Sequence, residues 1–175
     1  MIYTKREMRI ANGTSRSDGA VGANAVVPLY VMDYANKDDL ILDYGAGIDA
    51  IHKDELESKG YQNVTAYEFG DNLIQGVHDP LALRYKYDVV YASNVLNVQC
   101  SRRMLARTLE QLIDAVAPEV GALLIANFPK EPRKNSMNGE EVLSLAAKLG
   151  GDEFEVDILE GGESAPVFRM EYVGD

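Results

Sequence analysis

Two carboxylates and two glycines are the residues of this sequence whose types and spacing suggest chemistry. Asp43 ends a short apolar run, and Gly45 and Gly47 follow it at once. Glu68 comes 21 residues after Gly47. Glycines let the backbone adopt positive φ and approach a ligand closely, and an acid about 20 residues further on accepts ribose hydroxyls in nucleotide-binding folds. The spacing predicts a site for a ribose-bearing ligand.

The elements that must position these residues can be read from the same segment. Leu40–Leu42 and Val64–Tyr67 are apolar runs typical of buried strands. The polar stretch between them predicts a helix through Ser58, closed by Gly60 and capped by Asp49. Contact with the bound ligand is the alternative role for the Asp49 carboxylate. A strand, glycine turn, helix and strand begin an open α/β sheet, which holds nucleotide-like ligands beyond the carboxyl ends of its strands.

The residue before the first glycine distinguishes two classes of ligand. Gly45-x-Gly47-x-x-Ala50 fits the loose dinucleotide fingerprint, but the anion of Asp43 would repel a pyrophosphate and attract a sulfonium or an ammonium. The run DYGAG resembles the first motif of class I S-adenosylmethionine-dependent methyltransferases, an acid-x-Gly-x-Gly signature. The resemblance implies that Asp43 serves the methionine end of the cofactor, that the glycines pass its middle and that Glu68 holds the ribose.

A second candidate region follows the strand expected at Tyr87–Ser93. In the resembled family this position lies beside the transferred methyl group, which implies that Ser93 contacts the cofactor and that Asn94 presents its amide to the acceptor or to the cofactor. Turn or capping chemistry is the alternative role for Asn94, and more so for Asn97. The run Ser93–Leu96 lacks the proline pair of base-amino methyltransferases, and no Pro-Cys nucleophile is visible. Both departures argue against methylation of DNA bases.

The resemblance leaves two other cofactor contacts open. Phe69–Lys86 is too loosely patterned for a further strand and helix, so this middle unit is expected to be shortened. Asp71 is the candidate for the adenine-binding acid, with Asp79 as the alternative. Gly13–Asn24 has loop composition, and its Arg16 either meets the methionine carboxylate or is solvated. We expect residues 1–24 to form an N-terminal arm or lid on a single domain, residues 25–175.

The remaining segments complete an α/β pattern. The helix expected over 102–117 has a stripe of apolar residues that packs on a sheet, and a basic, proline-containing loop, 128–138, follows a further buried strand. The expected fold is a single Rossmann-like doubly wound sheet of the class I methyltransferase type with a C-terminal antiparallel hairpin. Its other expected elements are a helix at 25–35, a strand at 121–127, a helix at 140–149, and hairpin strands at 154–159 and 166–173.

Composition limits the possible partners. The chain has 175 residues, 46% of them hydrophobic, which is enough for one domain with a core. A single cysteine, Cys100, excludes a disulfide framework and a cysteine zinc cluster, and no metal site is expected. The net charge of −11 disfavours direct nucleic-acid binding. With no signal peptide or membrane segment visible, a cytoplasmic protein is expected.

These observations favour S-adenosylmethionine-dependent methyl transfer, with a small molecule or a protein as the unidentified acceptor. One alternative is a non-catalytic methyltransferase-like domain that binds a partner protein, and a third is a dinucleotide-binding oxidoreductase. From Thr14 to Val116, the glycine motif, the shortened middle and the run SNVLNV are together similar to compact methyltransferases found among phage genes and in DNA-phosphorothioation gene clusters.

Overall fold

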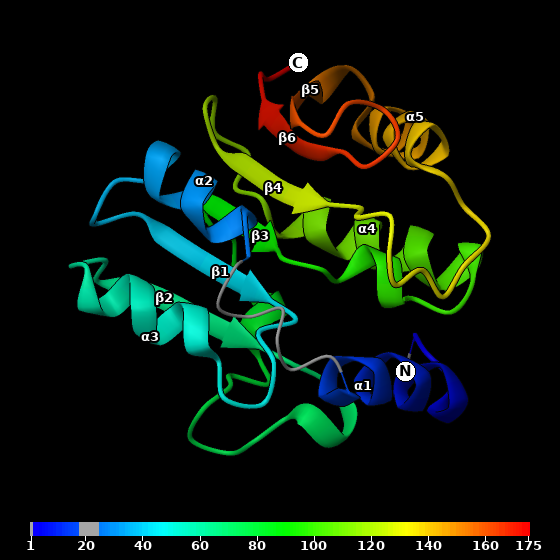
Figure 1. Ribbon diagram of the computed structural model, residues 1–175. Coiled ribbons are helices and arrows are strands. Elements are labelled where there is room, and N and C mark those ends of the chain that lie inside the picture. The colour runs from blue at the N-terminus through cyan, green and yellow to red at the C-terminus, as the bar shows by residue number, and fades with distance from the viewer. Residues whose placement is uncertain (1, 18–24) are drawn as a thin grey trace.

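A computed structural model describes residues 2–17 and 25–175, the side chains of 14–17 excepted (Figure 1). The described residues form one six-stranded sheet in the order β2-β1-β3-β4-β6-β5. Its first four strands in this order are parallel, while β6 runs antiparallel to both β4 and β5. The strands are β1 (Leu40–Tyr44), β2 (Asn63–Tyr67), β3 (Val89–Ala92), β4 (Leu123–Asn127), β5 (Phe154–Glu160) and β6 (Val167–Tyr172). The predicted doubly wound sheet with a terminal hairpin is confirmed.

The strand order reverses beside β1. The chain moves outward from β1 to the edge strand β2 and then crosses back to β3 on the other side of β1. Connections leave in opposite directions at such a switch point, which opens a crevice beyond the carboxyl ends of the strands. Asp43 lies at this point, in register with Ala66 of β2 and Tyr91 of β3.

The segment between β2 and β3 contains little regular secondary structure, as predicted. Its described elements are two single 3-10 turns, η2 (Gly70–Asn72) and η3 (Ala82–Arg84). No further strand lies beyond β2 in the described sheet, so β2 is its edge.

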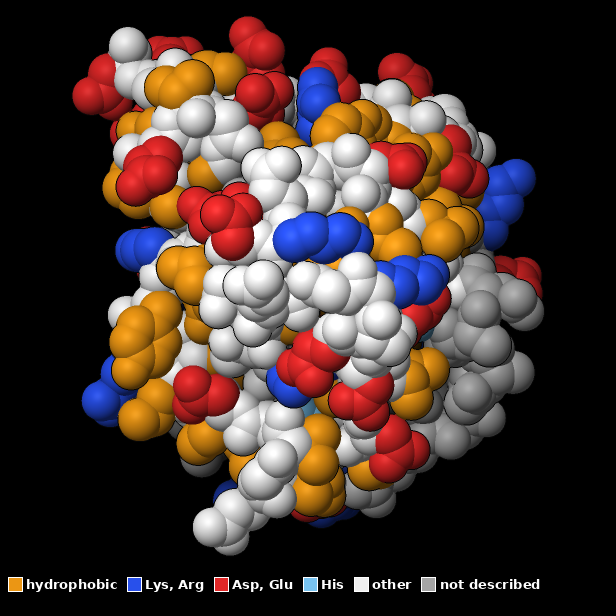
Figure 2. Space-filling model, turned by 90° about the vertical axis from the view of Figure 1, so that its left-hand side faces the viewer, with side chains coloured by type: hydrophobic (Ala, Val, Ile, Leu, Met, Phe, Trp, Pro, Cys, Tyr) orange, Lys and Arg blue, Asp and Glu red, His pale blue; other side chains and the backbone are white. Residues whose placement is uncertain are grey.

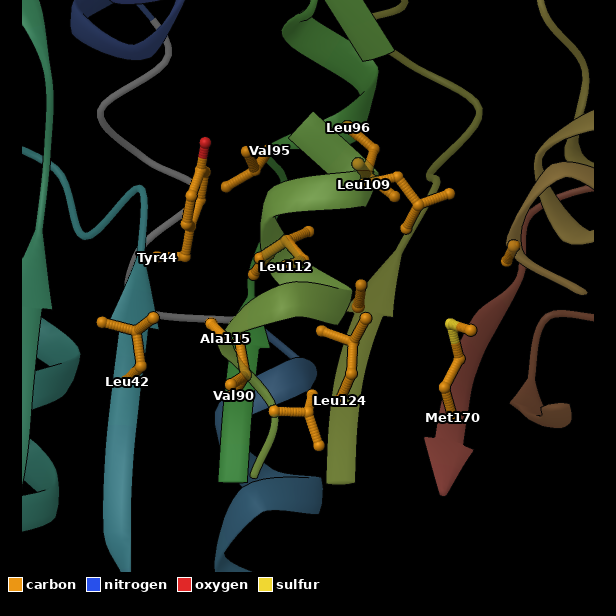
Figure 3. Packing of buried hydrophobic residues seen from close by; sticks show 14 of the residues in the cluster. Leu42, Tyr44, Val90, Val95, Leu96, Leu109, Leu112, Ala115, Leu124 and Met170 are labelled. Carbon is orange, nitrogen blue, oxygen red and sulfur yellow. The ribbon is translucent and has the colours of Figure 1, made fainter. Parts of the chain in front are cut away.

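Helices cover both faces of the sheet (Figure 1). On one face lie α4 (Arg102–Ala115) and α5 (Gly139–Gly150), and on the other lie α2 (Val27–Tyr34) and α3 (Ile51–Ser58). The predicted apolar stripe of α4 is confirmed, because Leu105, Leu109 and Leu112 are fully buried. Each such side chain contributes about 1.5–3 kcal/mol through burial. Figure 3 shows Leu109 and Leu112 beside the strand residues Leu42, Tyr44, Val90 and Leu124 of the same cluster.

Sequence patterns gave several helix ends correctly. Pro28 lies in the first turn of α2, Gly60 follows the end of α3, and Asn138 with Glu141 forms the predicted capping box of α5. Asp49 was expected to cap α3, and this is wrong. The cap position is Ala50, with φ of 47° and no side-chain cap. The chain enters this helix through a left-handed residue directly from the glycine turn.

The N-terminal segment is helical where a loop was expected. Helix α1 (Lys5–Ser17) includes residues 13–17 of the predicted loop, and residues 18–24 lie outside the described part. Thr4 and Glu7 form a capping box, with the Glu7 N–H donating to Thr4 Oγ1 (3.2 Å) and the Thr4 N–H to Glu7 Oε2 (2.7 Å). The T-x-x-E spacing of the sequence was the signal for this helix start.

The start of the chain is docked on the body of the domain. Tyr3 is buried, with its hydroxyl 2.7 Å from Thr108 Oγ1 on α4. Asn12 Nδ2 donates to the Phe69 carbonyl (3.2 Å), one residue after Glu68. Helix α1 therefore lies at the carboxyl edge of the sheet, beside the turns that follow β2 and β3 (Figure 1).

Figure 2 shows the amino-terminal edge of the sheet, where acidic and basic side chains are interspersed without a broad basic area.

Candidate functional site

The site is built around Asp43, the penultimate residue of β1. Its side chain is 2% exposed and faces Tyr91 across the β1–β3 pair. Burial raises the pKa of Asp43 to about 7, the Tyr91 hydroxyl opposes that shift and the negative charge of Glu68 adds to it. The Tyr91 hydroxyl lies near enough to act on this pKa, but the two groups do not reach hydrogen-bond geometry. Among the described residues, neither Asp43 Oδ2 nor the Tyr91 hydroxyl completes a hydrogen bond. A buried carboxylate oxygen without a partner costs free energy, and a cation placed there would recover it.

The glycine turn after β1 is tied to the end of β2. The Gly45 and Ala46 N–H groups both donate to the Tyr67 carbonyl, at 2.9 and 3.1 Å. Gly45 and Gly47 have φ of 73° and 80°, values that side chains rarely adopt. This geometry explains why two glycines occur here.

Glu68 closes the same turn. Its side chain is 5% exposed, and burial raises its pKa. Oε1 accepts the Gly47 N–H (2.8 Å) and Oε2 the Phe69 N–H (3.2 Å). These bonds fix the carboxylate beside the glycines and leave lone pairs on both oxygens. The structure thus brings Asp43, the glycines and Glu68 together, as the sequence predicted.

His78, in the loop after β2, contacts the glycine turn. Its Nδ1 accepts the Ile74 N–H (2.9 Å), and its Nε2 lies 2.7 Å from the Gly47 carbonyl. An acceptor role for Nδ1 assigns the proton to Nε2, which then donates to Gly47. His78 therefore holds the Gly47 carbonyl, while Glu68 holds the Gly47 N–H. No sequence spacing marked this contact, because the loop that carries it has no periodicity.

Asn94 forms a reciprocal pair with Asn127 at the ends of β3 and β4. The Asn94 N–H donates to Asn127 Oδ1 (2.7 Å), and Asn127 Nδ2 donates to Asn94 Oδ1 (2.9 Å). Asn94 has φ of 57°, a left-handed conformation that asparagine tolerates. The backbone donor fixes the orientation of both amides, so the Asn94 NH2 group is the part left for a ligand. Sequence reasoning missed Asn127.

The other predicted residues are more dispersed. Ser93 follows β3, and its buried Oγ has no hydrogen-bond partner among the described residues. Asp71 is exposed in η2. Asp79 has a local role, since its Oδ1 accepts the Leu81 N–H (2.8 Å).

Asn97 donates to the Pro132 carbonyl (2.7 Å), which supports the structural alternative for this residue. Arg16 is in α1, but its side chain lies outside the described part.

The two glycines should respond differently to substitution. A Cβ on Gly45 would lie 2.6 Å from Val95 Cγ2, whereas a Cβ on Gly47 would meet no described atom within 4 Å. Both changes carry the cost of a positive φ, roughly 1 kcal/mol. We expect Gly45→Ala to lower the melting temperature well beyond Gly47→Ala, and Gly47→Ala to act chiefly on ligand binding. Thermal unfolding with S-adenosylmethionine titration measures both effects, and equal melting temperatures would contradict the steric argument.

Solved structures with the same architecture identify the fold. A TehB-like S-adenosylmethionine-dependent methyltransferase from Corynebacterium glutamicum is 15% identical and superposes with a TM-score of 0.63, covering 93% of this chain and 97% of that one. The chain has the class I methyltransferase fold. No protein-family model and no curated protein matches the sequence.

Two further solved structures resemble this chain to a similar degree. Magnesium protoporphyrin IX methyltransferase from Synechocystis, with bound S-adenosylhomocysteine, is 14% identical with a TM-score of 0.59, covering 95% of this chain and 85% of that one. A sugar N-methyltransferase from a Streptoalloteichus species is 12% identical with a TM-score of 0.60, covering 100% of this chain and 97% of that one. At these identities the class I methyltransferase fold is what the proteins share.

The described part of the chain has neither a cluster of metal-ligating side chains nor a membrane-spanning helix. No group of three or more potential metal-ligating side chains occurs there. None of the helices described is both long and apolar enough to cross a bilayer.

Proposed function

We propose that this chain binds S-adenosylmethionine and transfers its methyl group to an acceptor. The observation that carries the proposal is the unpartnered oxygen of buried Asp43, beside a glycine turn that Glu68 closes. An anion in a poorly solvated position favours a cationic guest, and S-adenosylmethionine carries both a sulfonium and an ammonium. The same anion disfavours a dinucleotide pyrophosphate.

The residues present fit this cofactor. Asp43 would attract its cationic methionine end, and the open space over Gly47 would admit its middle without a Cβ in the way. Glu68 would accept the ribose hydroxyls through its remaining lone pairs. We further assign Ser93 to the cofactor, Asp71 to the adenine end and Arg16 to the methionine carboxylate. Residues 1–24 would act as a lid, a role supported by the contact of Asn12 beside Glu68.

The chain's own residues would orient the acceptor. When bound, the cofactor supplies an electrophilic methyl group for in-line attack. Asn94, held rigid by Asn127, would direct its NH2 group toward an acceptor oxygen. Alignment and proximity supply much of the rate in such displacements. Burial of the carboxylates limits water at the reacting end of the site.

A small molecule or a protein is the acceptor class we propose. The net charge of −11 and the absence of a proline pair after Asn94 both argue against DNA bases. A radioactive methyl-transfer assay with a cell extract tests this step directly. Cofactor binding without any transfer would favour the non-catalytic alternative, for which the short β2–β3 connection is the supporting feature.

Glu68→Ala should weaken S-adenosylmethionine binding by more than ~1.5 kcal/mol, because two ribose hydroxyls lose a charged acceptor. Loss of the Gly47 contact adds to the effect by freeing the turn. Isothermal titration calorimetry measures the affinity, and exposed Glu119 provides the control, Glu119→Ala. An unchanged affinity in Glu68→Ala would show that this acid does not hold the ribose. Mass spectrometry of the purified protein provides an independent check for retained cofactor.

A further inference from the structure

A second candidate binding site lies at the N-terminus of α4. An open hollow of about 700 Å³ occurs there, between this helix and the loop that follows β4. Ligand sites typically have about 300–1,000 Å³. Half of the residues that line the hollow are cations, in a chain whose net charge is −11. These cations are Arg102, Arg103, Arg133 and Lys134.

Only part of this positive charge is balanced by carboxylates of the described residues. Arg103 Nη2 lies 2.6 Å from Glu7 Oε1, and Arg102 Nη1 lies 2.5 Å from Glu141 Oε2. The structure shows no carboxylate paired with Arg133 or Lys134 in its described part. The hollow therefore has an excess of two positive charges.

The cations differ in how firmly they are held. Arg133 stacks over the Phe128 ring at 4.2 Å and donates to the Ser164 carbonyl (2.7 Å), so its position is fixed. Lys134 is exposed, and its ammonium has no hydrogen bond or ion pair with the described residues. The site thus combines a fixed guanidinium with a cation that is free to meet a ligand.

Helix α4 adds a partial positive charge. It has 14 residues, and Ser101 caps it by accepting the Met104 N–H (3.0 Å). The first N–H groups of a helix lack intrahelical partners, and its dipole favours an anion at this end. The first turn carries no acidic residue.

The loop that lines the hollow is connected to the candidate methyl-transfer site. The Lys134 N–H donates to the Asn97 carbonyl (2.7 Å), three residues after Asn94. The loop that carries Arg133 and Lys134 begins directly after Asn127, the partner of Asn94. Two short connections therefore link the cations to the asparagine pair.

We propose that this hollow binds a phosphoryl group carried by a small-molecule methyl acceptor. A phosphate monoester has a charge of about −1.5 to −2 at pH 7, which matches the excess of positive charge. Arg133 Nε and Nη2 donate to backbone carbonyls, so its Nη1 and the Lys134 ammonium are the groups left to donate to the phosphate oxygens. The acidic remainder of the surface opposes a long nucleic acid. The acceptor assignment rests on the proposed function, whereas the anion site itself does not.

Titration of ¹⁵N-labelled protein with inorganic phosphate tests the site without any cofactor. We expect saturable amide shifts centred on residues 100–103 and 133–136, and no such shifts with chloride at equal ionic strength. Lys134→Gln should weaken phosphate binding at least fivefold. Lys130→Gln, in the same loop but outside the hollow, should leave it unchanged. Non-saturable shifts, shifts centred elsewhere, or equal effects of the two substitutions would overturn the proposal.

Methyl transfer to cell-extract metabolites tests the acceptor. Phosphatase treatment of the extract should abolish labelling, and Lys134→Gln should reduce it while S-adenosylmethionine affinity stays the same. Labelling that survives both changes would overturn the acceptor assignment. So would tight binding of a fluorescent single-stranded oligonucleotide that depends on Lys134, because it would identify nucleic acid as the ligand. Failure to bind S-adenosylmethionine would instead contradict the proposed function and leave the phosphate titration to decide the anion site.

Discussion

Asp43→Asn should stabilise the ligand-free protein at pH 8 by roughly 2 to 4 kcal/mol, an unusual result for a buried residue. Burial raises the pKa of Asp43 from 3.8 to about 7. The folded state therefore holds this proton more tightly than the unfolded chain does between these two pH values. Asparagine is neutral throughout, so it does not carry the cost of ionising a buried carboxyl.

The stabilisation expected from Asp43→Asn should depend on pH. Because the folded-state pKa is the higher one, the wild-type free energy of unfolding should fall as the pH rises from about 4 to about 7, by roughly 1.4 kcal/mol per pH unit. The stabilisation by Asp43→Asn should be small at pH 4.5 and full at pH 8. Urea unfolding at the two pH values measures it, with exposed Asp38→Asn as the control. A gain that is equal at both pH values would contradict a titration of Asp43.

A residue that is needed for ligand binding can lower the stability of the ligand-free protein. The carboxyl of Asp43 faces Tyr91 and lies in the field of Glu68, and neither neighbour carries a positive charge. The chain thus keeps a buried acid that its own fold does not neutralise. A cationic ligand would supply that neutralisation, which is why the proposed cofactor and the expected stability change have one physical cause.

The sheet was predictable because its signals are local. Buried parallel strands appear as apolar runs, and the α4 stripe has helical spacing, so β1, β3, β4 and α4 were each recognised. Residues 69–86 have neither an apolar run nor helical spacing, so no strand and helix were predicted there, in agreement with the structure. The ends of the elements were predicted less exactly. Helix α4 stops at Ala115, short of the expected Ala117, because Val116 pairs with Tyr87 as a bridge.

The N-terminal segment was predicted only in part, because its helix start has a local signal whereas its docking on the domain rests on contacts distant in sequence. Residues 13–17 have loop composition, but α1 extends through them, from a helix start fixed by Thr4 and Glu7. Docking of Tyr3 on Thr108 spans 105 positions of the chain. Local propensity contains no information about such contacts.

The same distinction holds within the candidate site. Asp43, the glycines and Glu68 were recognised because one connected motif carries them. Asn127 was missed, and the contact that His78 makes was not foreseen, since each residue meets the site only through folding. Asn127 pairs with Asn94 across 33 positions, and His78 contacts Gly47 across 31. Supporting residues of this kind become visible only when the strand ends are brought together.

The affinity for S-adenosylmethionine should rise as the pH rises from 5.5 to 7, approaching tenfold per pH unit, and level off above 7. A cationic ligand binds the ionised form of Asp43, so binding below its pKa of about 7 must release a proton. The raised pKa of Glu68 acts in the same direction. Calorimetry in two buffers of different ionisation enthalpy measures the released proton, and an affinity that is equal at pH 5.5 and 7.5 would contradict this linkage.

S-adenosylhomocysteine identifies which cation Asp43 meets, because it keeps the ammonium and lacks the sulfonium. If the sulfonium is the partner, the product should bind with a shallower pH dependence than the substrate. If the ammonium is the partner, the two slopes should agree, and Asp43→Asn should flatten both equally. In the first case Asp43 favours substrate over product, since an unpaired carboxylate opposes the neutral thioether that remains after transfer.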